Sequence, residues 1–398
     1  MTRKGLVVII LVLFLVGGAI VLSALPIVEG VVSGDLQWRV PGADEVAAEA
    51  VQEQRFDVQG RAKLNVENNH GAVSVAVSVT GGPGNQIVIT AHKRVWAPNQ
   101  TEAQSELDGL KVVATQDGAT ITVRVEQKPV VIGGSRADEV ELAISVPTET
   151  AVTAFTSFGA VRLAGTRGQA DLRTGIGGIE VKDVTGALKA DSGNGAINIQ
   201  RVQAEGGEVA LTSRSGRIDY HSGRAESVNV ETGSGQVTLS DLTVTGLLKL
   251  TSRIGSVTLK QALATSYDLD SQAGAISVDG ATGRVKVRSG SGKVTITGGS
   301  QADLDLESNI GAISFAGSLG SGPHTVTSGS GRIHLTLPKD LGLNLDLRTI
   351  SGQFKPNLPV TITSLPERSR WLGTINGGGA NLVVSTRNGD IILDILNP

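Results

Sequence analysis

The sequence predicts an all-β protein: a right-handed parallel β-solenoid of about 12 coils of 18–21 residues. Three observations predict this fold. A turn glycine recurs at a nearly constant spacing, short apolar alternations flank each glycine, and the composition is rich in glycine and poor in aromatic residues. Before the solenoid we expect a β-rich N-terminal cap region and one transmembrane helix.

The repeat is clearest between Ser289 and Ile296, which reads SGSGKVTI. Its turn glycine, Gly292, has counterparts 18 to 21 residues apart as far as Gly352. A fixed period of this length is typical of solenoids. The turn glycines are Gly159, Gly177, Gly195, Gly216, Gly235, Gly255, Gly274, Gly292, Gly311, Gly331, Gly352 and Gly389.

Apolar residues alternate with polar ones on both sides of each turn. Val285 and Val287 precede Gly292, and Val294 and Ile296 follow it. A period of two indicates a strand with one buried face, and we expect the turn to use glycine because it adopts positive φ cheaply. One coil is too small to be stable alone, so coils must stack. Parallel crossovers are right-handed in nearly all proteins, which predicts the handedness.

The composition limits the possible functions. The chain has 398 residues, 52 of them glycine, and aromatic residues make up only 3%. The net charge of −3 gives no bulk attraction for nucleic acid. Cysteine is absent, which excludes disulfides, thiolate metal sites and a catalytic cysteine.

The N-terminus has the features of a membrane segment. Arg3 and Lys4 precede an apolar run from Gly5 to about Val28, long enough to span a bilayer. We expect residues 1–28 to be a transmembrane signal anchor, with a cleaved signal peptide or a buried core helix as alternatives. The two positive charges place the N-terminus in the cytoplasm. The expected location is therefore the cell membrane, crossed once, with the bulk of the chain extracytoplasmic.

The rest of the chain divides into four regions. Residues 29–54 are expected to be a stalk or linker in which 44–54, rich in Ala and Glu, could be helical. Residues 55–150 are expected to form the β-rich cap region. That region should hold one short helix from Thr101, the expected N-cap, to Leu110.

The regular solenoid is predicted over residues 151–354. After Gly352 the period breaks, because Pro356, Pro359 and Pro366 interrupt strand pairing. We therefore expect residues 355–398 to form a C-terminal loop followed by a capping coil.

The outward residues of the strands give one candidate contact face. On the strand after each turn, five consecutive coils present a small hydroxyl residue. This face could bind a glycan, another chain or a surface, although Thr is also simply common on exposed strands. The candidate residues are Thr238, Thr258, Ser277, Thr295 and Ser314.

On the strand before each turn the outward charges alternate in sign from coil to coil. Opposite charges that face each other across a ladder stabilise it slightly and fix its register. The series is Lys249, Asp268, Lys286 and Asp305.

No motif predicts catalysis, a cofactor or a metal. The five histidines are not spaced as local metal ligands, and the serines in the turns are not in a nucleophile elbow. No helix follows the glycine-rich turns to hold a phosphate. We therefore expect no catalytic, cofactor-binding or metal site.

Several features together resemble a known family. The segment from Val140 to Pro147 (VELAISVP) is followed by AVTA from Ala151 and by tandem Ser-Gly-x-Gly turns behind one N-terminal membrane segment. This resembles the bacterial "putative adhesin" family, a domain of unknown function, over residues 55–396. The resemblance implies an extracytoplasmic β-solenoid with an adhesion or envelope role, and it implies no catalytic residues.

The function expected from the sequence is a non-catalytic, membrane-anchored surface adhesion or envelope scaffold module. Its partners would be the membrane, through the N-terminal helix, and a glycan, cell-envelope or surface ligand. One alternative is a polysaccharide-active enzyme on a β-helix. Another is a self-assembling structural solenoid.

Overall fold

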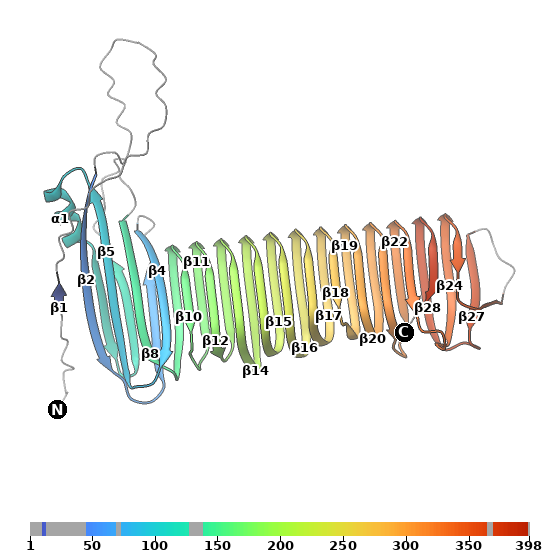
Figure 1. Cartoon of the computed structure of the whole chain (residues 1–398), viewed down its shortest axis with the longest axis horizontal. Helices are drawn as coiled ribbons and strands as arrows, with labels where there is room; N and C mark the ends of the chain where they lie inside the picture. Colours follow the sequence, from blue (N-terminus) through green and yellow to red (C-terminus); the bar gives the residue numbers. More distant parts are fainter. Residues whose placement is uncertain (1–9, 13–44, 69–72, 127–137, 364–368, 397–398) are drawn as a thin grey trace, which may run out of the picture.

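The computed structural model describes residues 10–12, 45–68, 73–126, 138–363 and 369–396. They form a long rod of two facing β-sheets, with one helix at its N-terminal end (Figure 1). We call the strands that precede the turn glycines the first sheet and those that follow them the second sheet. Within the solenoid, neighbouring strands of each sheet are parallel, so the predicted all-β parallel β-solenoid is confirmed. The right-handed winding stays a prediction.

The first sheet runs from one end of the rod to the other. Strands β14 to β17 and β20 bend at one edge and take part in both sheets. The strand order is β6 (Lys111–Asp117), β7 (Thr120–Glu126), β3 (Ala62–Asn68), β9 (Thr150–Phe158), β11 (Ala170–Ile176), β13 (Leu188–Asn194), β14 (Ile197–Ser215), β15 (Ile218–Ser234), β16 (Val237–Ile254), β17 (Val257–Ala273), β19 (Thr282–Ser291), β20 (Val294–Ile310), β22 (His324–Ser330), β28 (Ala380–Asn388), β24 (Leu343–Ser351), β27 (Arg370–Ile375) and β26 (Val360–Ile362).

The second sheet lies opposite. Its N-terminal strands include antiparallel pairs, and all later pairs are parallel. The order is β1 (Ile10–Val12), β2 (Val46–Asp57), β5 (Gln86–Ala97), β8 (Asp138–Pro147), β4 (Val73–Gly82), β10 (Val161–Ala164), β12 (Ile179–Thr185), β14 to β17, β18 (Ile276–Asp279), β20, β21 (Ile313–Leu319), β23 (Ile333–Leu337), β29 (Ile391–Ile395) and β25 (Phe354–Pro356).

The C-terminal coils stack out of sequence order. From β9 to β22 the chain makes about nine complete turns in sequence order. The coil of β28 and β29 then lies between β22/β23 and β24/β25, so the last strands of the chain are not the last of the rod. The prediction of about 12 coils is too high, because it counted every turn glycine, including two whose coils leave the sequence order.

The C-terminal prediction is corrected in the same way. Within residues 355–398, the segment expected to be a loop contains β26 and β27, which pair antiparallel with each other. Strand β27 also pairs antiparallel with β24 and covers its free edge. The expected capping coil, β28/β29, is instead inserted one coil before the end. The strand β28 can occupy this position because it forms hydrogen bonds with β22 on one edge and β24 on the other. The periodicity of the sequence does not reveal the order in which coils stack.

The N-terminal predictions need two corrections. Part of the expected stalk, residues 29–54, is strand and not linker or helix, because Val46–Asp57 forms β2 along β5. The helix α1 spans Gln100–Gly109, and its N-cap is Asn99 and not Thr101: Asn99 Oδ1 accepts a hydrogen bond from the Glu102 amide at 3.0 Å.

No helix among the described residues is long and apolar enough to cross a membrane. The anchor predicted for residues 1–28 lies largely outside the described part of the chain. Its described residues, Ile10–Val12, form the short strand β1 beside β2.

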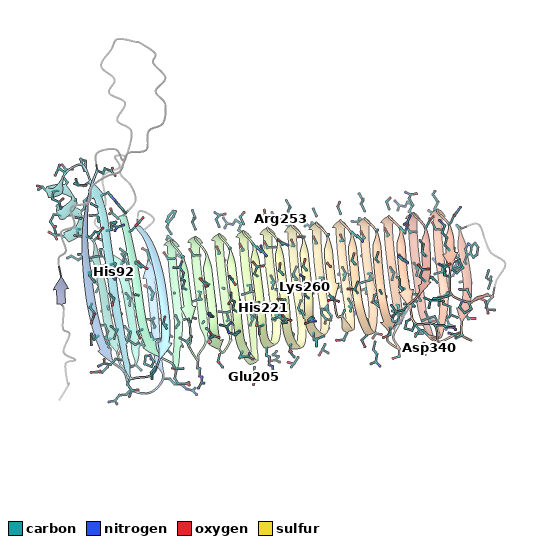
Figure 2. The ribbon with its side chains drawn as sticks, in the orientation of Figure 1. His92, Glu205, His221, Arg253, Lys260 and Asp340 are labelled. Atoms are coloured by element: carbon teal, nitrogen blue, oxygen red, sulfur yellow. The ribbon has the colours of Figure 1, made fainter. Side chains whose placement is uncertain are left out.

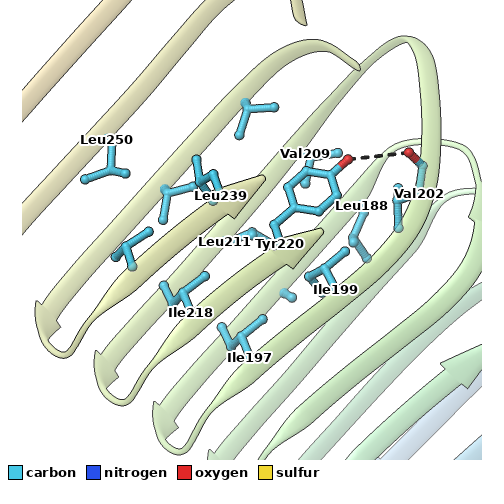
Figure 3. Close-up of a cluster of buried hydrophobic side chains, with 14 of the residues drawn as sticks. Leu188, Ile197, Ile199, Val202, Val209, Leu211, Ile218, Tyr220, Leu239 and Leu250 are labelled. Carbon is cyan, nitrogen blue, oxygen red and sulfur yellow. Dashed lines mark hydrogen bonds between the residues drawn. The ribbon is translucent and has the colours of Figure 1, made fainter. Parts of the chain in front are cut away.

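The core is the layer between the two sheets. Alternate residues of each strand point inward, as predicted, and Figure 3 shows one section that includes Leu188, Ile199 and Leu211. Tyr220 is buried in this layer, and its hydroxyl donates to the Val202 carbonyl at 3.4 Å. Val, Ile, Leu and Ala suit this narrow space because they pack without polar atoms.

The turn glycines are required by close stacking as well as by backbone conformation. Gly235 has a φ of 152°, and a Cβ there would lie 2.0 Å from the carbonyl oxygen of Gly216. At Gly331, where no left-handed φ occurs, a Cβ would still lie 2.1 Å from the carbonyl of Gly311. The expected reason, positive φ, is therefore only part of the explanation.

Two buried charged residues lie at the helix end of the rod. Lys93 Nζ donates to the Leu110 carbonyl at 3.0 Å, and burial lowers the pKa of its amine. Burial, reinforced by Glu106 of α1, raises the pKa of the Asp138 carboxyl to about 6. The folded state therefore keeps a proton on Asp138 that the unfolded chain loses nearer pH 4.

The close contact between stacked turns predicts that adding one methyl group at a turn glycine destabilises the protein. Gly235→Ala should lower the free energy of unfolding by about 3 kcal/mol, since a left-handed residue and a backbone overlap both have to be accommodated. Urea unfolding followed by circular dichroism measures this change. Gly82→Ala is the matched control, because no atom lies within 4 Å of its added Cβ. Equal unfolding midpoints for the two variants would contradict the stacking explanation.

The inserted coil predicts a local effect of truncation. Deleting residues 380–398 removes β28 and β29, the parallel neighbours of β24 and β25. Amide hydrogen exchange should become fast in 343–351, while β15 to β17 keep their protection, because each coil depends on its neighbours. Unchanged protection in 343–351 would show that this coil does not depend on β28 and β29.

The raised pKa of Asp138 predicts that the free energy of unfolding depends on pH. Its pKa is higher in the folded state, so its contribution to stability is greatest below about pH 4 and is lost as pH rises towards 6. Asp138→Asn should remove this dependence and stabilise the protein by about 2 kcal/mol at pH 7. Urea titrations at several pH values measure the difference from wild type. Glu139→Gln, which changes an exposed neighbour in the same strand, is the control and should reproduce the wild-type slope.

Candidate functional site

The five predicted hydroxyl residues form one continuous row on the second sheet. Adjacent strands place Thr238 opposite Thr258, Thr258 opposite Ser277, Ser277 opposite Thr295, and Thr295 opposite Ser314. All five side chains point outward, since the residues on either side of each are buried. We call Thr238, Thr258, Ser277, Thr295 and Ser314 the hydroxyl row.

The hydroxyls of the row lie at the surface of the second sheet. Ser277 is exposed and the other four side chains are half-buried by their neighbours along the ladder. Within the described part of the chain, none of the five hydroxyls has a hydrogen-bond partner. Each can therefore donate and accept.

Charged groups lie at the two ends of the row. Asp219 precedes Thr238 in the ladder and forms an ion pair with Arg217 at 2.6 Å. His334 follows Ser314, and its Nε2 lies 2.6 Å from Asp394 Oδ2. Hydrogen bonds from Asn357 and His334 hold the pKa of the Asp394 carboxyl below its usual value. The neutral row is thus bounded by groups that already have partners.

The next outward column of the same sheet is also mostly small and polar. Thr297 donates to Asp279 Oδ1 at 3.1 Å, and Lys260 is the neighbour of Ser240. Between Ser240 and Thr297 this column carries two charged residues, Lys260 and Asp279. These charges therefore lie beside the neutral hydroxyl row and not within it.

The first sheet presents a different surface. The predicted alternation of charge is confirmed: Lys249 faces Asp268, Asp268 faces Lys286, and Lys286 faces Asp305. Lys286 Nζ lies 3.8 Å from Asp268, and Arg288 lies 3.7 Å from Glu307 in the adjacent column. Exposed pairs of this kind each contribute about 0–1 kcal/mol, so they set the register more than the stability.

A second series of hydroxyl residues, not identified from the sequence, is buried. Ser or Thr occurs three residues before each turn glycine, and Ser192, Ser213 and Ser328 donate to the turn-glycine carbonyl of the preceding coil at 2.9, 3.2 and 3.0 Å. The sequence pattern that could have identified these residues is the first serine of Ser-Gly-x-Gly. Its inward direction follows from continuing the alternation two residues beyond the last apolar one, as from Val287 to Ser289.

In the regions that the structure describes, no group of three His, Asp or Glu side chains is placed to hold a metal ion. His324 is buried, its Nδ1 accepts from the Leu304 amide at 3.3 Å, and burial lowers the pKa of its imidazole. Its Nε2 lies 3.3 Å from the Gly320 carbonyl oxygen, so both ring nitrogens are engaged by the backbone.

Comparisons with solved structures give low overall similarity. A "putative cell adhesion protein" from Clostridium sporogenes has 9% identity and a TM-score of 0.18, with 87% of this chain and 100% of that chain covered. A "putative adhesin" from Bacteroides fragilis has 12% identity and a TM-score of 0.20, covering 89% and 99%. A "putative lipid binding protein" from Parabacteroides distasonis has 9% identity and a TM-score of 0.26, covering 75% and 94%. Scores this low carry no argument about function.

The family assignment comes from the sequence. Among curated proteins, none matches this chain. The family model described as Toastrack DUF4097 matches residues 83–279 and 222–394, which together span most of the solenoid and part of the cap region. The resemblance seen in the glycine turns is confirmed, and the chain belongs to the Toastrack DUF4097 family.

Proposed function

We propose that this protein is a non-catalytic, extracytoplasmic adhesion or scaffold module that binds through the hydroxyl row. The observation that carries the proposal is the row itself: five hydroxyls in register on adjacent strands, without hydrogen-bond partners among the described residues. A buried frame holds them in place, because the residue on each side of every hydroxyl belongs to the core.

The mechanism is multivalent hydrogen bonding. One exposed hydroxyl adds little affinity, since a net hydrogen bond contributes only about 0.5–1.5 kcal/mol. Neighbouring coils repeat the group at about 4.8 Å, the strand spacing of a β-sheet. A polymer with repeated polar groups, such as a glycan of the cell envelope, can engage several coils at once and gain avidity.

Membrane attachment and location are part of the same proposal. Residues 1–28 supply the apolar segment, and Arg3 and Lys4 orient it with the N-terminus in the cytoplasm. The strand β2, which follows this segment, belongs to the N-terminal end of the rod in Figure 1. An anchor there would leave both long faces of the solenoid accessible outside the cell.

The hydroxyl row is tested by lysine substitution. Thr238→Lys, Thr258→Lys and Thr295→Lys in one chain should weaken attachment to a glycan or surface ligand at least tenfold, because three long charged side chains cover the row. The ligand is first found by screening the full-length protein against glycan arrays and isolated cell envelopes. The dissociation constants of the variant and of the wild type are then compared.

A matched control places the same lysines on the other sheet. Thr212→Lys, Thr251→Lys and Thr325→Lys change outward residues of the first sheet, so they add the same charge at a distance from the row. Attachment should stay at the wild-type level in this control. A folded row variant that attaches as well as wild type, or a control that loses attachment equally, would refute the proposal.

A further inference from the structure

The edge of the rod that holds the glycine turns has a strong excess of positive charge. We define the turn edge as the two residues before and the one residue after each turn glycine, from Ser157 to Asp390. In this part of the described chain it carries a single acidic residue, Asp390. Its basic residues are Arg214, Arg217, Arg253, Lys293, Arg332 and Arg387. This excess occurs in a chain whose net charge is −3.

Most of these positive charges are not neutralised by the protein. Arg214, Arg253, Lys293 and Arg387 form no ion pair with any residue that the structure describes. Arg217 pairs with Asp219 at 2.6 Å, and the acidic residue of the edge, Asp390, is engaged by Lys355 at 2.7 Å. The charge of the turn edge is therefore available to a partner.

The opposite edge carries charges of both signs, and some of them are paired. Figure 2 shows Arg253 at the turn edge, with Glu205 and Asp340 at the other edge. There Arg201 pairs with Asp183 at 2.5 Å, and Arg224 lies 3.9 Å from Glu205. The excess of positive charge thus belongs to one edge and not to the rod as a whole.

The turn edge also exposes apolar side chains. Between residues 150 and 354, five of the seven large apolar residues that are exposed lie on it, and the other two, Leu247 and Leu263, lie elsewhere. Single exposed apolar residues are ordinary, so the relevant fact is that they share an edge with the free cations. The five are Phe158, Ile176, Ile254, Ile310 and Ile350, with exposed fractions of 36%, 49%, 58%, 63% and 72%.

We propose that the turn edge docks the rod lengthwise on an anionic lipid surface. A Lys or Arg near such a surface strengthens binding by a factor of about five. The isoleucines give the second interaction, because apolar side chains enter the boundary between headgroups and acyl chains. A soluble polyanion would bind the cations and leave the isoleucines in water, so the combination favours lipid.

The docked orientation is compatible with ligand binding on the faces of the rod. A rod lying on its turn edge has both sheets standing upright from the membrane. The hydroxyl row then stays open to solvent. This inference does not depend on the hydroxyl row, and either one can fail without the other.

The test measures which edge of the full-length protein lies near lipid. The chain has no cysteine, so one introduced cysteine carries a single fluorescent label. Ser291→Cys places it on the turn edge, and Glu205→Cys places it on the opposite edge. In nanodiscs with phosphatidylglycerol and a lipid-attached quencher, the Ser291 label should be quenched at least threefold more than the Glu205 label, and less at high salt. Equal quenching of both labels would overturn the proposal.

Charge reversal then tests the cations. Arg214→Glu, Arg253→Glu, Lys293→Glu and Arg387→Glu together should abolish the quenching of the Ser291 label. The matched control makes the same net change elsewhere, with Lys189→Glu, Lys249→Glu, Lys260→Glu and Arg284→Glu, and should keep the quenching. Equal loss in both variants would show a general charge effect and refute a docking edge.

The isoleucines separate lipid from other polyanions. Ile254→Ser, Ile310→Ser and Ile350→Ser leave the charge unchanged and remove apolar contact. Quenching of the Ser291 label should fall at least threefold if the edge enters the lipid interface. Unchanged quenching would show that the contact is electrostatic only and would overturn the proposed insertion of the edge into lipid.

Discussion

The structure depends on the close approach of each turn glycine to the turn of the neighbouring coil. This approach lets the hydrogen-bond ladder continue through the turn: the Gly274 amide donates to the Ser291 carbonyl and the Ile276 amide to the Lys293 carbonyl, both at 2.9 Å. A side chain at the glycine would push the coils apart and break the ladder on both sheets. The contact therefore fixes the spacing and the register of the rod together.

The buried hydroxyls before the turn glycines strengthen the contact between turns in some coils and not in others. Where Ser192 or Ser213 donates to the glycine carbonyl of the preceding coil, the turn is closed by a side chain as well as by the backbone. Near the middle of the rod, Thr232, Ser252 and Ser271 are buried without a partner among the described groups. An unpaired buried hydroxyl costs about 1–3 kcal/mol. The backbone hydrogen bonds between coils therefore offset this unfavourable free energy in consecutive coils.

A frame of this kind leaves the outward residues free to differ from side to side. The first sheet pairs opposite charges between coils. The second sheet offers hydroxyls that have no hydrogen-bond partner among the described residues, and the turn edge holds cations and isoleucines. Because each coil adds one residue to every outward column, neighbouring columns can differ in composition. The proposed binding by one face and the proposed membrane contact by one edge are therefore compatible on a single rod.

The sequence by itself determined the solenoid, the positions of the turns, the inward alternation and the hydroxyl row, because each follows from local periodicity. Strand register then followed from stacking equal coils, as the pairing of Thr258 with Ser277 illustrates. Only the tertiary structure decided that β28 and β29 lie before β24 and β25, that Val46–Asp57 is a strand and that the buried serines face the glycine carbonyls. These features arise from contacts between segments that are distant in the chain. Several strand pairings are equally compatible with the local sequence, and the packing of the whole rod selects one of them.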